Sequence, residues 1–350
     1  MFLGRPAPLC LFVLVAACGQ PASAPLAASS FSPPAQLQAT PQCAQPVILT
    51  ATTTKLTPST AHAGVTEFPL RQAGGPTGIA AAPSGGAWFT EEDQGRIALI
   101  ASDGTLTEWS LPNGLVKPGA YIDSDSNGGI WFPERGEATI SHVDRTGQYR
   151  ACRLPFPAEP FSVAVDGHRV WFTDFTSSHI GYMDTSDGTI RYWSTSSVLG
   201  QPSGIAVTAN GVWFSDYSSN ALLRVTGTDH LSLAHMPSPG GAMGMARARD
   251  GSIWIAQSGS DRVVRLVSSG TLTSYSLGSS AQQPQSTAEA EDGSIWVTES
   301  RSNSLGKLRP DGSNAQTLAV GQWPDGIVTS GGRVWFTEYQ SEAVGFVAAG

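Results

Sequence analysis

The sequence predicts an all-β protein, a seven-bladed β-propeller whose last blade is completed by a strand from before the first repeat. Two observations predict this fold. A tryptophan recurs in one local pattern with spacings of 43, 40, 42, 41, 42 and 39 residues. The composition, with 39 Gly and 24 Pro but only 14% charged residues, is typical of many short strands joined by tight turns.

Each repeat is expected to form one four-stranded blade. In the first repeat the expected strands are 78–81, 87–90, 96–100 and 105–109, separated by turns that contain glycine. An isolated four-stranded sheet cannot bury its faces, so the blades are expected to pack around an axis. The recurring tryptophans lie in the second strands and are Trp88, Trp131, Trp171, Trp213, Trp254, Trp296 and Trp335. We expect their rings to fill the space between blades, with ligand stacking as the alternative for any one of them.

The two ends of the repeat region are expected to meet. The seventh repeat stops at Val347 without a fourth strand, and residues 64–70 match the fourth-strand pattern of residues 104–111. This early segment is therefore predicted to complete the last blade, which removes the free edges of an open ring. The propeller domain is assigned to residues 62–350.

The start of the chain is typical of bacterial export. Residues 1–17 combine Arg5 with a short apolar stretch, as in a signal peptide. Small residues lead directly to Cys18, a pattern that resembles a lipobox, so we expect a lipidated Cys18 that anchors the protein in the cell envelope. The alternative is an ordinary signal peptide in which Cys18 is incidental.

Residues 18–61 are rich in Pro, Ala, Ser and Thr and show no sustained periodicity, so we expect a disordered tether. Cys43 lies in this tether and Cys152 in the propeller. Outside the cytoplasm the two cysteines form either a disulfide or two unrelated thiols, and the sequence leaves both possibilities open.

Charge and motifs exclude several classes of function. The formal charge of −8 argues against a nucleic-acid partner, because no basic stripe is present to neutralise phosphates. The sequence has no His-Glu-x-x-His zinc motif, no Gly-x-Ser-x-Gly elbow and no phosphate-binding loop. The expected partner is a small molecule, glycan, peptide or protein, bound by a monomer whose only contact with the membrane is its lipid anchor.

The recurring phrase of the repeats resembles that of a known family. Clear instances are Pro76-Thr77-Gly78-Ile79, Trp88-Phe89-Thr90-Glu91, Pro202-Ser203-Gly204-Ile205, His179-Ile180-Gly181 and Trp335-Phe336-Thr337-Glu338. This repeat is similar to that of the virginiamycin B lyases, also called streptogramin lyases, and the resemblance covers Gly64 to Val347. It implies a seven-bladed propeller and an enzyme that opens a cyclic depsipeptide antibiotic at its ester by elimination.

The resemblance also implies a catalytic set, which this chain changes. The family places a histidine base after a proline that enters strand one of late blades, a glutamate before that proline, and a magnesium ion that polarises the carbonyl. The residues in this post-proline slot are here Thr77, Gly119, Phe161, Ser203, Met243, Gln285 and Asp325. Asp325 replaces the last histidine and Trp323 the glutamate, while Glu338 matches a second family glutamate. Asp325 and Glu338 are thus the candidate catalytic residues, although an ordinary aspartate is a weaker base than imidazole at neutral pH.

An acid follows six of the seven repeat tryptophans by three residues. These acids are Glu91, Glu134, Asp174, Asp216, Glu299 and Glu338, and Gln257 occupies the seventh position. A ring of carboxylates around one mouth of the axis suits Mg²⁺ or Ca²⁺, which prefer oxygen ligands. The alternative is structural: the acid accepts hydrogen bonds from loops of its own repeat.

Aromatic and polar residues accompany the acids in the loops of this face. The candidate ligand-binding residues are Phe161, Phe175, Tyr217, Gln285, Trp323 and Tyr339. Such a mixture suits a small molecule, sugar, peptide or depsipeptide. Two hypotheses follow. One is an envelope-anchored binding propeller, and the other is a metal-dependent lyase or a lactone or ester hydrolase with altered catalytic residues.

Overall fold

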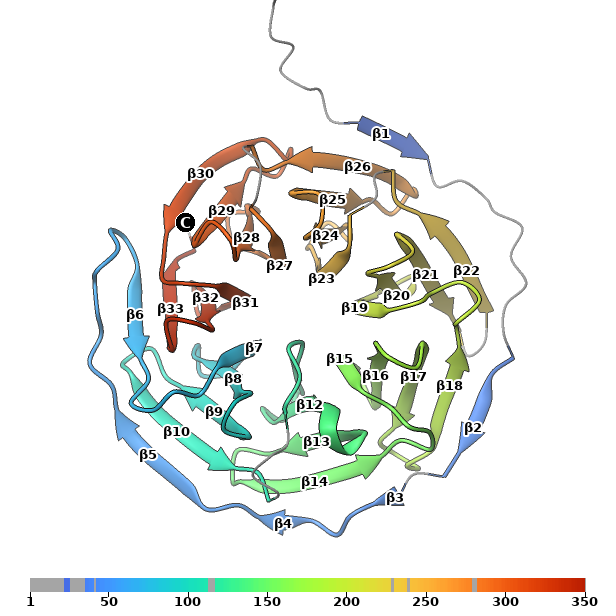
Figure 1. Cartoon of the computed structure of the whole chain (residues 1–350), viewed down its shortest axis with the longest axis horizontal. Coiled ribbons are helices and arrows are strands. Elements are labelled where there is room, and N and C mark those ends of the chain that lie inside the picture. Colours follow the sequence, from blue (N-terminus) through green and yellow to red (C-terminus); the bar gives the residue numbers. More distant parts are fainter. Residues whose placement is uncertain are drawn as a thin grey trace, which may run out of the picture.

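Seven antiparallel sheets surround a central axis in the computed structural model, each sheet forming one blade (Figure 1). The structure describes residues 22–25, 35–40, 42–112, 117–227, 230–237, 240–278 and 282–349. The predicted signal peptide and the predicted lipidation site Cys18 lie outside these described residues. Within them the one helical segment is a short 3₁₀ turn, η1 (Arg135–Glu137). The predicted all-β seven-bladed propeller is therefore confirmed.

Four strands run outward from the axis in each blade, and their bounds follow the chain order.
Blade 1 contains β7 (Pro76–Ala81), β8 (Ala87–Glu91), β9 (Arg96–Ile100) and β10 (Thr105–Ser110).
Blade 2 contains β11 (Asp123–Ser124), β12 (Ile130–Glu134), β13 (Thr139–Val143) and β14 (Gln148–Arg153).
Blade 3 contains β15 (Pro160–Asp166), β16 (Arg169–Asp174), β17 (His179–Asp184) and β18 (Ile190–Ser194).
Blade 4 contains β19 (Pro202–Thr208), β20 (Gly211–Asp216), β21 (Ala221–Thr226) and β22 (His230–His235).
Blade 5 contains β23 (Ala242–Arg247), β24 (Ile253–Gln257), β25 (Arg262–Leu266) and β26 (Thr271–Ser276).
Blade 6 contains β27 (Pro284–Glu289), β28 (Ile295–Glu299), β29 (Ser304–Leu308) and β30 (Asn314–Ala319).
Blade 7 contains β31 (Pro324–Ser330), β32 (Arg333–Glu338), β33 (Ala343–Ala348) and, from the start of the chain, β6 (Thr66–Pro69).

The repeat tryptophans form the core between blades, as predicted. Trp88, Trp171, Trp254 and Trp335 are at most 1% exposed, and each packs in an apolar cluster with side chains of a neighbouring sheet. Large aromatic rings suit this position because they fill the wedge between two twisted sheets. Trp131 differs, since its side chain is only partly buried.

The ring closes as the sequence predicts. Strand β6 pairs antiparallel with β33, with Phe68 opposite Val344. Phe68 is 1% exposed and packs against Trp335 and Phe346 with ring centroids 6.5 and 6.0 Å away. The first and last parts of the propeller thus share one sheet, which leaves no free edge between blades 7 and 1.

The structure differs from the disordered tether expected over 18–61. Five short strands of this segment lie along the outer edges of the blades, as the blue ribbon in Figure 1 shows. They are β1 (Ala22–Pro25) on blade 5, β2 (Leu37–Ala39) on blade 3, β3 (Gln42–Cys43) and β4 (Val47–Ile48) on blade 2, and β5 (Ala51–Lys55) on blade 1. We call these strands the belt. The physical reason is that outer strands expose unpaired backbone groups, which an extended segment of almost any composition can satisfy.

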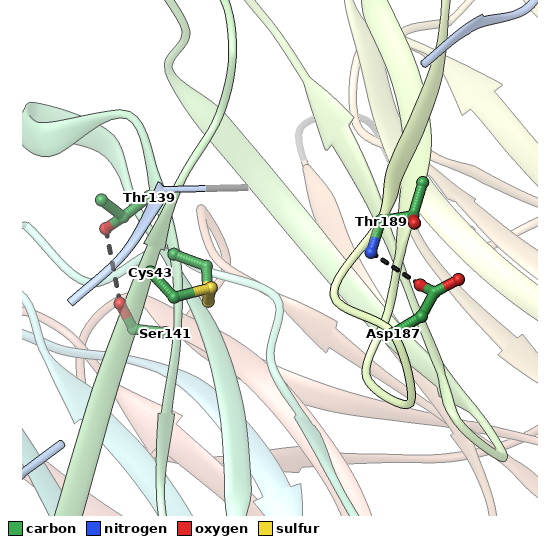
Figure 2. Close-up of a disulfide and its surroundings, with 6 residues drawn as sticks. Cys43, Thr139, Ser141, Asp187 and Thr189 are labelled. Carbon is green, nitrogen blue, oxygen red and sulfur yellow. Dashed lines mark hydrogen bonds between the residues drawn. A yellow bond between two sulfur atoms is a disulfide. The ribbon is translucent and has the colours of Figure 1, made fainter. Parts of the chain in front are cut away.

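A disulfide joins Cys43 of the belt to Cys152 of β14, with an S–S distance of 2.11 Å (Figure 2). The two cysteines are register partners in adjacent antiparallel strands. Of the two possibilities that the sequence left open, the structure shows the disulfide. It fixes the belt to blade 2 at one point between β2 and β4.

Candidate functional site

The loops that enter the first strands and the loops that leave the second strands lie at one face of the ring. The register shows this, because the proline that opens strand one pairs with the acid that ends strand two in blades such as 1, 4 and 7. The first strands surround the axis (Figure 1). This face, with the end of the axial channel, is the face on which the sequence places its candidate residues, and we call it the upper mouth.

The six acids do not converge in the channel. Their side chains are at most 2% exposed, and each accepts hydrogen bonds within its own blade. Asp216 accepts from the backbone N–H of Gln201 (2.6 Å) and Ser218 (3.0 Å), which joins the two upper-face loops of blade 4. Asp174 has the same role in blade 3, where it accepts from the N–H of Glu159 at 3.1 Å. The structural alternative therefore accounts for these aspartates.

The buried glutamates bond to side chains of the next strands instead. Glu91 forms an ion pair with Arg96, whose Nε lies 2.6 Å from Oε2. Glu134 accepts from the hydroxyls of Thr139 and Tyr149, both at 2.9 Å. In blade 6, Glu299 accepts from the hydroxyl of Ser304 at 2.7 Å. These bonds hold the second strand against the third and fourth strands.

Glu338, the residue that matches the family's last-blade glutamate, also faces the interior of its blade. Its Oε1 accepts from the N–H of Gly321 at 2.6 Å, and its carboxyl hydrogen-bonds Glu67 of β6. Burial, and then the Glu67 carboxylate, raise the pKa of Glu338 to about 8. Glu67 in turn lies 2.7 Å from Nδ1 of His62. The protonated form of Glu338 is thus held in a polar chain that ties β6 to blade 7.

The residues present do not fit a magnesium site of the kind that the resemblance implies. Trp323 offers no ligand where the family has a glutamate, and Glu338 is engaged inside its blade. Among the described residues no three His, Cys, Asp or Glu side chains are grouped closely enough to hold a metal ion. The predicted ring of six acids therefore does not form one cation site, and we derive no step through a metal.

Asp325 is the acid that the structure does place at the upper mouth. Its side chain is largely surrounded by protein. No described residue donates a hydrogen bond to its carboxylate or forms an ion pair with it. Burial raises the pKa of Asp325 to about 7, with a smaller contribution from the Glu92 carboxylate that the Arg135 guanidinium partly offsets. Glu92 and Arg135 belong to blades 1 and 2 and form an ion pair of 2.7 Å with each other. An aspartate with a pKa in this range exchanges protons near neutral pH, as histidine does.

Three of the predicted ligand-binding residues form a continuous aromatic row. The ring centroids of Phe161 and Phe175 are 5.0 Å apart, and those of Phe175 and Tyr217 are 6.0 Å apart. The row extends to Tyr121, 5.4 Å from Phe161, and the Arg135 guanidinium lies 5.9 Å from the Phe161 ring. This row crosses blades 2, 3 and 4 and reaches solvent mainly at Tyr217, which is 39% exposed, whereas Phe161 is 9% exposed.

Tyr121 is a further residue at the upper mouth, outside the predicted candidate residues. Its hydroxyl donates a hydrogen bond to the backbone oxygen of Gln285 at 3.0 Å, which connects blade 2 to blade 6 across the axis. Below this ring the first strands line a cavity of about 430 Å³. Tyr121 therefore forms the floor of the upper mouth.

A signal for Tyr121 is present in the repeats. The residue directly before the strand-one aliphatic position is Gly or Ser in the other repeats, as in Gly78-Ile79 and Gly326-Ile327, and is Tyr121 in the second. Small residues are needed there because a Cβ at Gly326 would meet the backbone oxygen of Thr77 at 2.5 Å.

The remaining predicted residues lie apart from the row. The Gln285 side chain turns into its blade and donates to the Ser300 hydroxyl at 3.1 Å. Trp323 has a φ of 58°, a left-handed conformation that costs a tryptophan about 1 kcal/mol or more, and its backbone oxygen accepts from the N–H of Tyr339. The Tyr339 hydroxyl donates to Asp93 of blade 1 at 3.2 Å. Trp323 and Tyr339 thus border the mouth at the junction of blades 7 and 1.

The comparisons with known proteins agree with this architecture. Virginiamycin B lyase from Nocardia farcinica is 30% identical over 116 residues. In this match the chain spans only 40% of the length of that curated relative. A solved virginiamycin B lyase from Staphylococcus aureus is 26% identical, with a TM-score of 0.75 over 81% of this chain and 98% of that one. A catalytically inactive form of the S. aureus enzyme with quinupristin gives 26% identity and a TM-score of 0.76, covering 81% of this chain and 98% of that one. The model of the virginiamycin B lyase family matches residues 49–169 and 164–350, and the chain therefore belongs to that family.

Proposed function

We propose that the upper mouth binds a compact, peptide-like small molecule that carries aromatic groups. The observation that carries this proposal is the aromatic row of Tyr121, Phe161, Phe175 and Tyr217. Rings whose centroids are 5.0 and 6.0 Å apart offer aromatic groups against which a ligand with planar rings can pack. Asp325 and the Glu92–Arg135 pair add polar groups on the adjoining side of the mouth.

Binding without the family's reaction is our first candidate because two of the family's catalytic positions carry other residues. Asp325 replaces the histidine base and Trp323 the glutamate before it. The buried Glu338 is bonded to Gly321 and Glu67, away from the ligand row. A mouth that has this aromatic row but lacks these groups supports recognition more directly than catalysis.

A specific observation favours a second candidate, which is elimination with Asp325 as the base. An aspartate with an ordinary pKa is a weak base at neutral pH. Burial raises the pKa of Asp325 to about 7, so this side chain is a stronger base than an ordinary aspartate. In such a step the Asp325 carboxylate would take a proton from the carbon next to the carbon that bears the ester oxygen. The C–H electron pair would form the new C=C bond, and the leaving oxygen would depart with the C–O pair and take up a proton.

One experiment separates the two candidates. The protein is incubated with quinupristin, the compound present with one similar enzyme, and binding is followed calorimetrically while products are followed by mass spectrometry and chromatography. Binding with quinupristin recovered intact supports the first candidate. A product of unchanged mass but altered retention supports elimination, and a product heavier by one water indicates hydrolysis. No binding and no product would refute both candidates for this ligand class.

We also propose that Cys18 is lipidated and holds the propeller in the bacterial cell envelope, where it contacts the membrane through this anchor only. The sequence pattern before Cys18 supports this proposal. Among the described residues no helix is long and apolar enough to cross a membrane. Mass spectrometry of the mature N-terminal peptide tests the proposal. A diacylated Cys18 is expected, together with release of a Cys18→Ser variant from the membrane fraction, whereas an unmodified N-terminus would contradict it.

A further inference from the structure

A second cavity lies at the rim of the propeller, away from the upper mouth. It encloses about 450 Å³ between the belt, blade 2 and the hairpin that joins β17 to β18. This volume falls within the range of ~300–1,000 Å³ that is usual for small-molecule sites. Cys43 of the belt and Pro46, between β3 and β4, form its outer wall. Figure 2 shows the disulfide on one side of the view and the hairpin with Asp187 and Thr189 on the other.

The inner wall of the cavity carries an aromatic platform. Trp131 lines it and is only partly buried, whereas the other six repeat tryptophans are at most 8% exposed. His142 packs beside Trp131, with ring centroids 4.6 Å apart, and its Nε2 lies 2.7 Å from Oδ2 of Asp125. The imidazole is therefore fixed against the indole, and the platform is held in place.

Hydrogen-bond donors and hydrogen-bond acceptors surround this platform. Arg150 and Gln148 of β14 supply donors, and no described residue is bonded to the Arg150 guanidinium. Asp187 of the blade 3 hairpin supplies an acceptor, and Asp184 lines the cavity beside it, with Oδ1 accepting from the Ser186 N–H and Oδ2 3.4 Å from Nε2 of His168. Asp187 uses Oδ1 to accept from the N–H of Thr189 at 2.7 Å, a bond drawn in Figure 2, and this leaves Oδ2 for other donors. One arginine against two aspartates disfavours a nucleotide or another polyanion.

From this arrangement we infer that the rim cavity, which we call the rim site, binds a saccharide. A sugar ring has one face of C–H groups, which packs on an indole, and a perimeter of hydroxyls that both donate and accept hydrogen bonds. Trp131 can pack against the C–H face of the sugar. The donors and acceptors of Arg150, Gln148, Asp184 and Asp187 can bond to its hydroxyls. This inference is independent of the function proposed for the upper mouth, because the two sites share no residue.

Saturation-transfer NMR with three disaccharides, maltose, lactose and N,N′-diacetylchitobiose, tests the rim site. We expect transfer to the ring C–H protons of at least one disaccharide at about 10 mM, a concentration that occupies most of a site of even millimolar affinity. Affinity should fall at least tenfold in Trp131→Ala and in Arg150→Ala. Trp131→Phe should retain part of it, since a smaller ring keeps part of the platform. The Trp131→Phe variant also provides a folded comparison if Trp131→Ala does not fold.

A matched pair of hairpin variants provides the control. Asp187→Asn keeps an oxygen for the Thr189 N–H but changes the group that faces the cavity, so it should weaken binding severalfold. Asp311→Asn makes the same change in the blade 6 hairpin, where Asp311 accepts from the Ser313 N–H, and should leave binding unchanged. Absence of transfer to all three disaccharides would overturn the inference. Binding that survives in both Trp131→Ala and Arg150→Ala, or that is lost instead in Phe161→Ala of the upper mouth, would also overturn it.

Discussion

Asp325 is a residue whose chemistry is strongly changed by its position. Its pKa is about 7 in the folded protein against an ordinary value of 3.8. At a pH between these two pKa values, Asp325 of the folded protein retains a proton that the same side chain of the unfolded protein has released. Stability therefore decreases as the pH rises through this window, and above about pH 7 the protein carries the full cost of a buried carboxylate without a partner.

The Asp325→Asn variant tests this cost. It removes the charge and breaks no hydrogen bond to the side chain, so it should be more stable than the parent by on the order of 2 kcal/mol at pH 8. The difference should disappear near pH 4, where the parent is neutral. Urea unfolding of both proteins at the two pH values measures it. A difference that is the same at both pH values would show that Asp325 does not titrate near neutrality.

For single residues, the sequence predicted the place in the fold better than it predicted the burial and the bonding partners of the side chain. The period of the repeats placed Asp325 and Phe161 in equivalent slots and so at one mouth, because repeated strands put equivalent residues at equivalent places. It could not predict the raised pKa of Asp325, which depends on burial of the side chain and on Glu92 and Arg135 from other blades. Nor could it choose between a cation ring and structural bonds for acids such as Asp216, since that choice depends on where each side chain turns.

The belt is the element that the sequence did not predict. Its strands are two to five residues long, and such short segments show no period. Their partners are the outer edges of blades far along the chain, as in the pairing of Thr53 with Thr107. By contrast, the closing strand β6 was predictable because it repeats the fourth-strand pattern of the other blades.

The disulfide should stabilise the belt against opening. It closes a loop with a sequence separation of 109 residues, and disulfides typically contribute about 2–4 kcal/mol of stabilisation. We expect Cys43→Ser to lower the free energy of unfolding by this amount and to speed proteolysis between residues 44 and 56. Limited proteolysis followed by mass spectrometry, with and without reductant, measures the second effect. Equal cleavage of the parent and Cys43→Ser under non-reducing conditions would contradict this role.

The belt also links stability to the rim site. Cys43 and Pro46 form the outer wall of the cavity, so a released belt opens it. Reduction of the disulfide should therefore weaken saccharide binding at the rim while leaving the upper mouth unchanged.

At the scale of the whole molecule, closure of the ring depends on β6 rather than on the belt. Phe68 of β6 is 1% exposed, whereas Leu37 of belt strand β2 is 45% exposed. Phe68→Ala should lower the free energy of unfolding by about 3–5 kcal/mol, because it leaves a cavity beside Trp335. Leu37→Ala should change it by less than about 0.5 kcal/mol. Denaturant unfolding of the two variants compares them, and similar losses would mean that β6 does not close the core.

The central claim is that the upper mouth, with its aromatic row, is the ligand site of this propeller. Hydrogen–deuterium exchange with and without quinupristin tests it most directly. The account predicts slower exchange at the upper-mouth segments 158–162, 174–178 and 216–219, and loss of this protection in Phe161→Ala. Exchange that is unchanged at these segments, or slowed only at the rim segment 184–188, would contradict it.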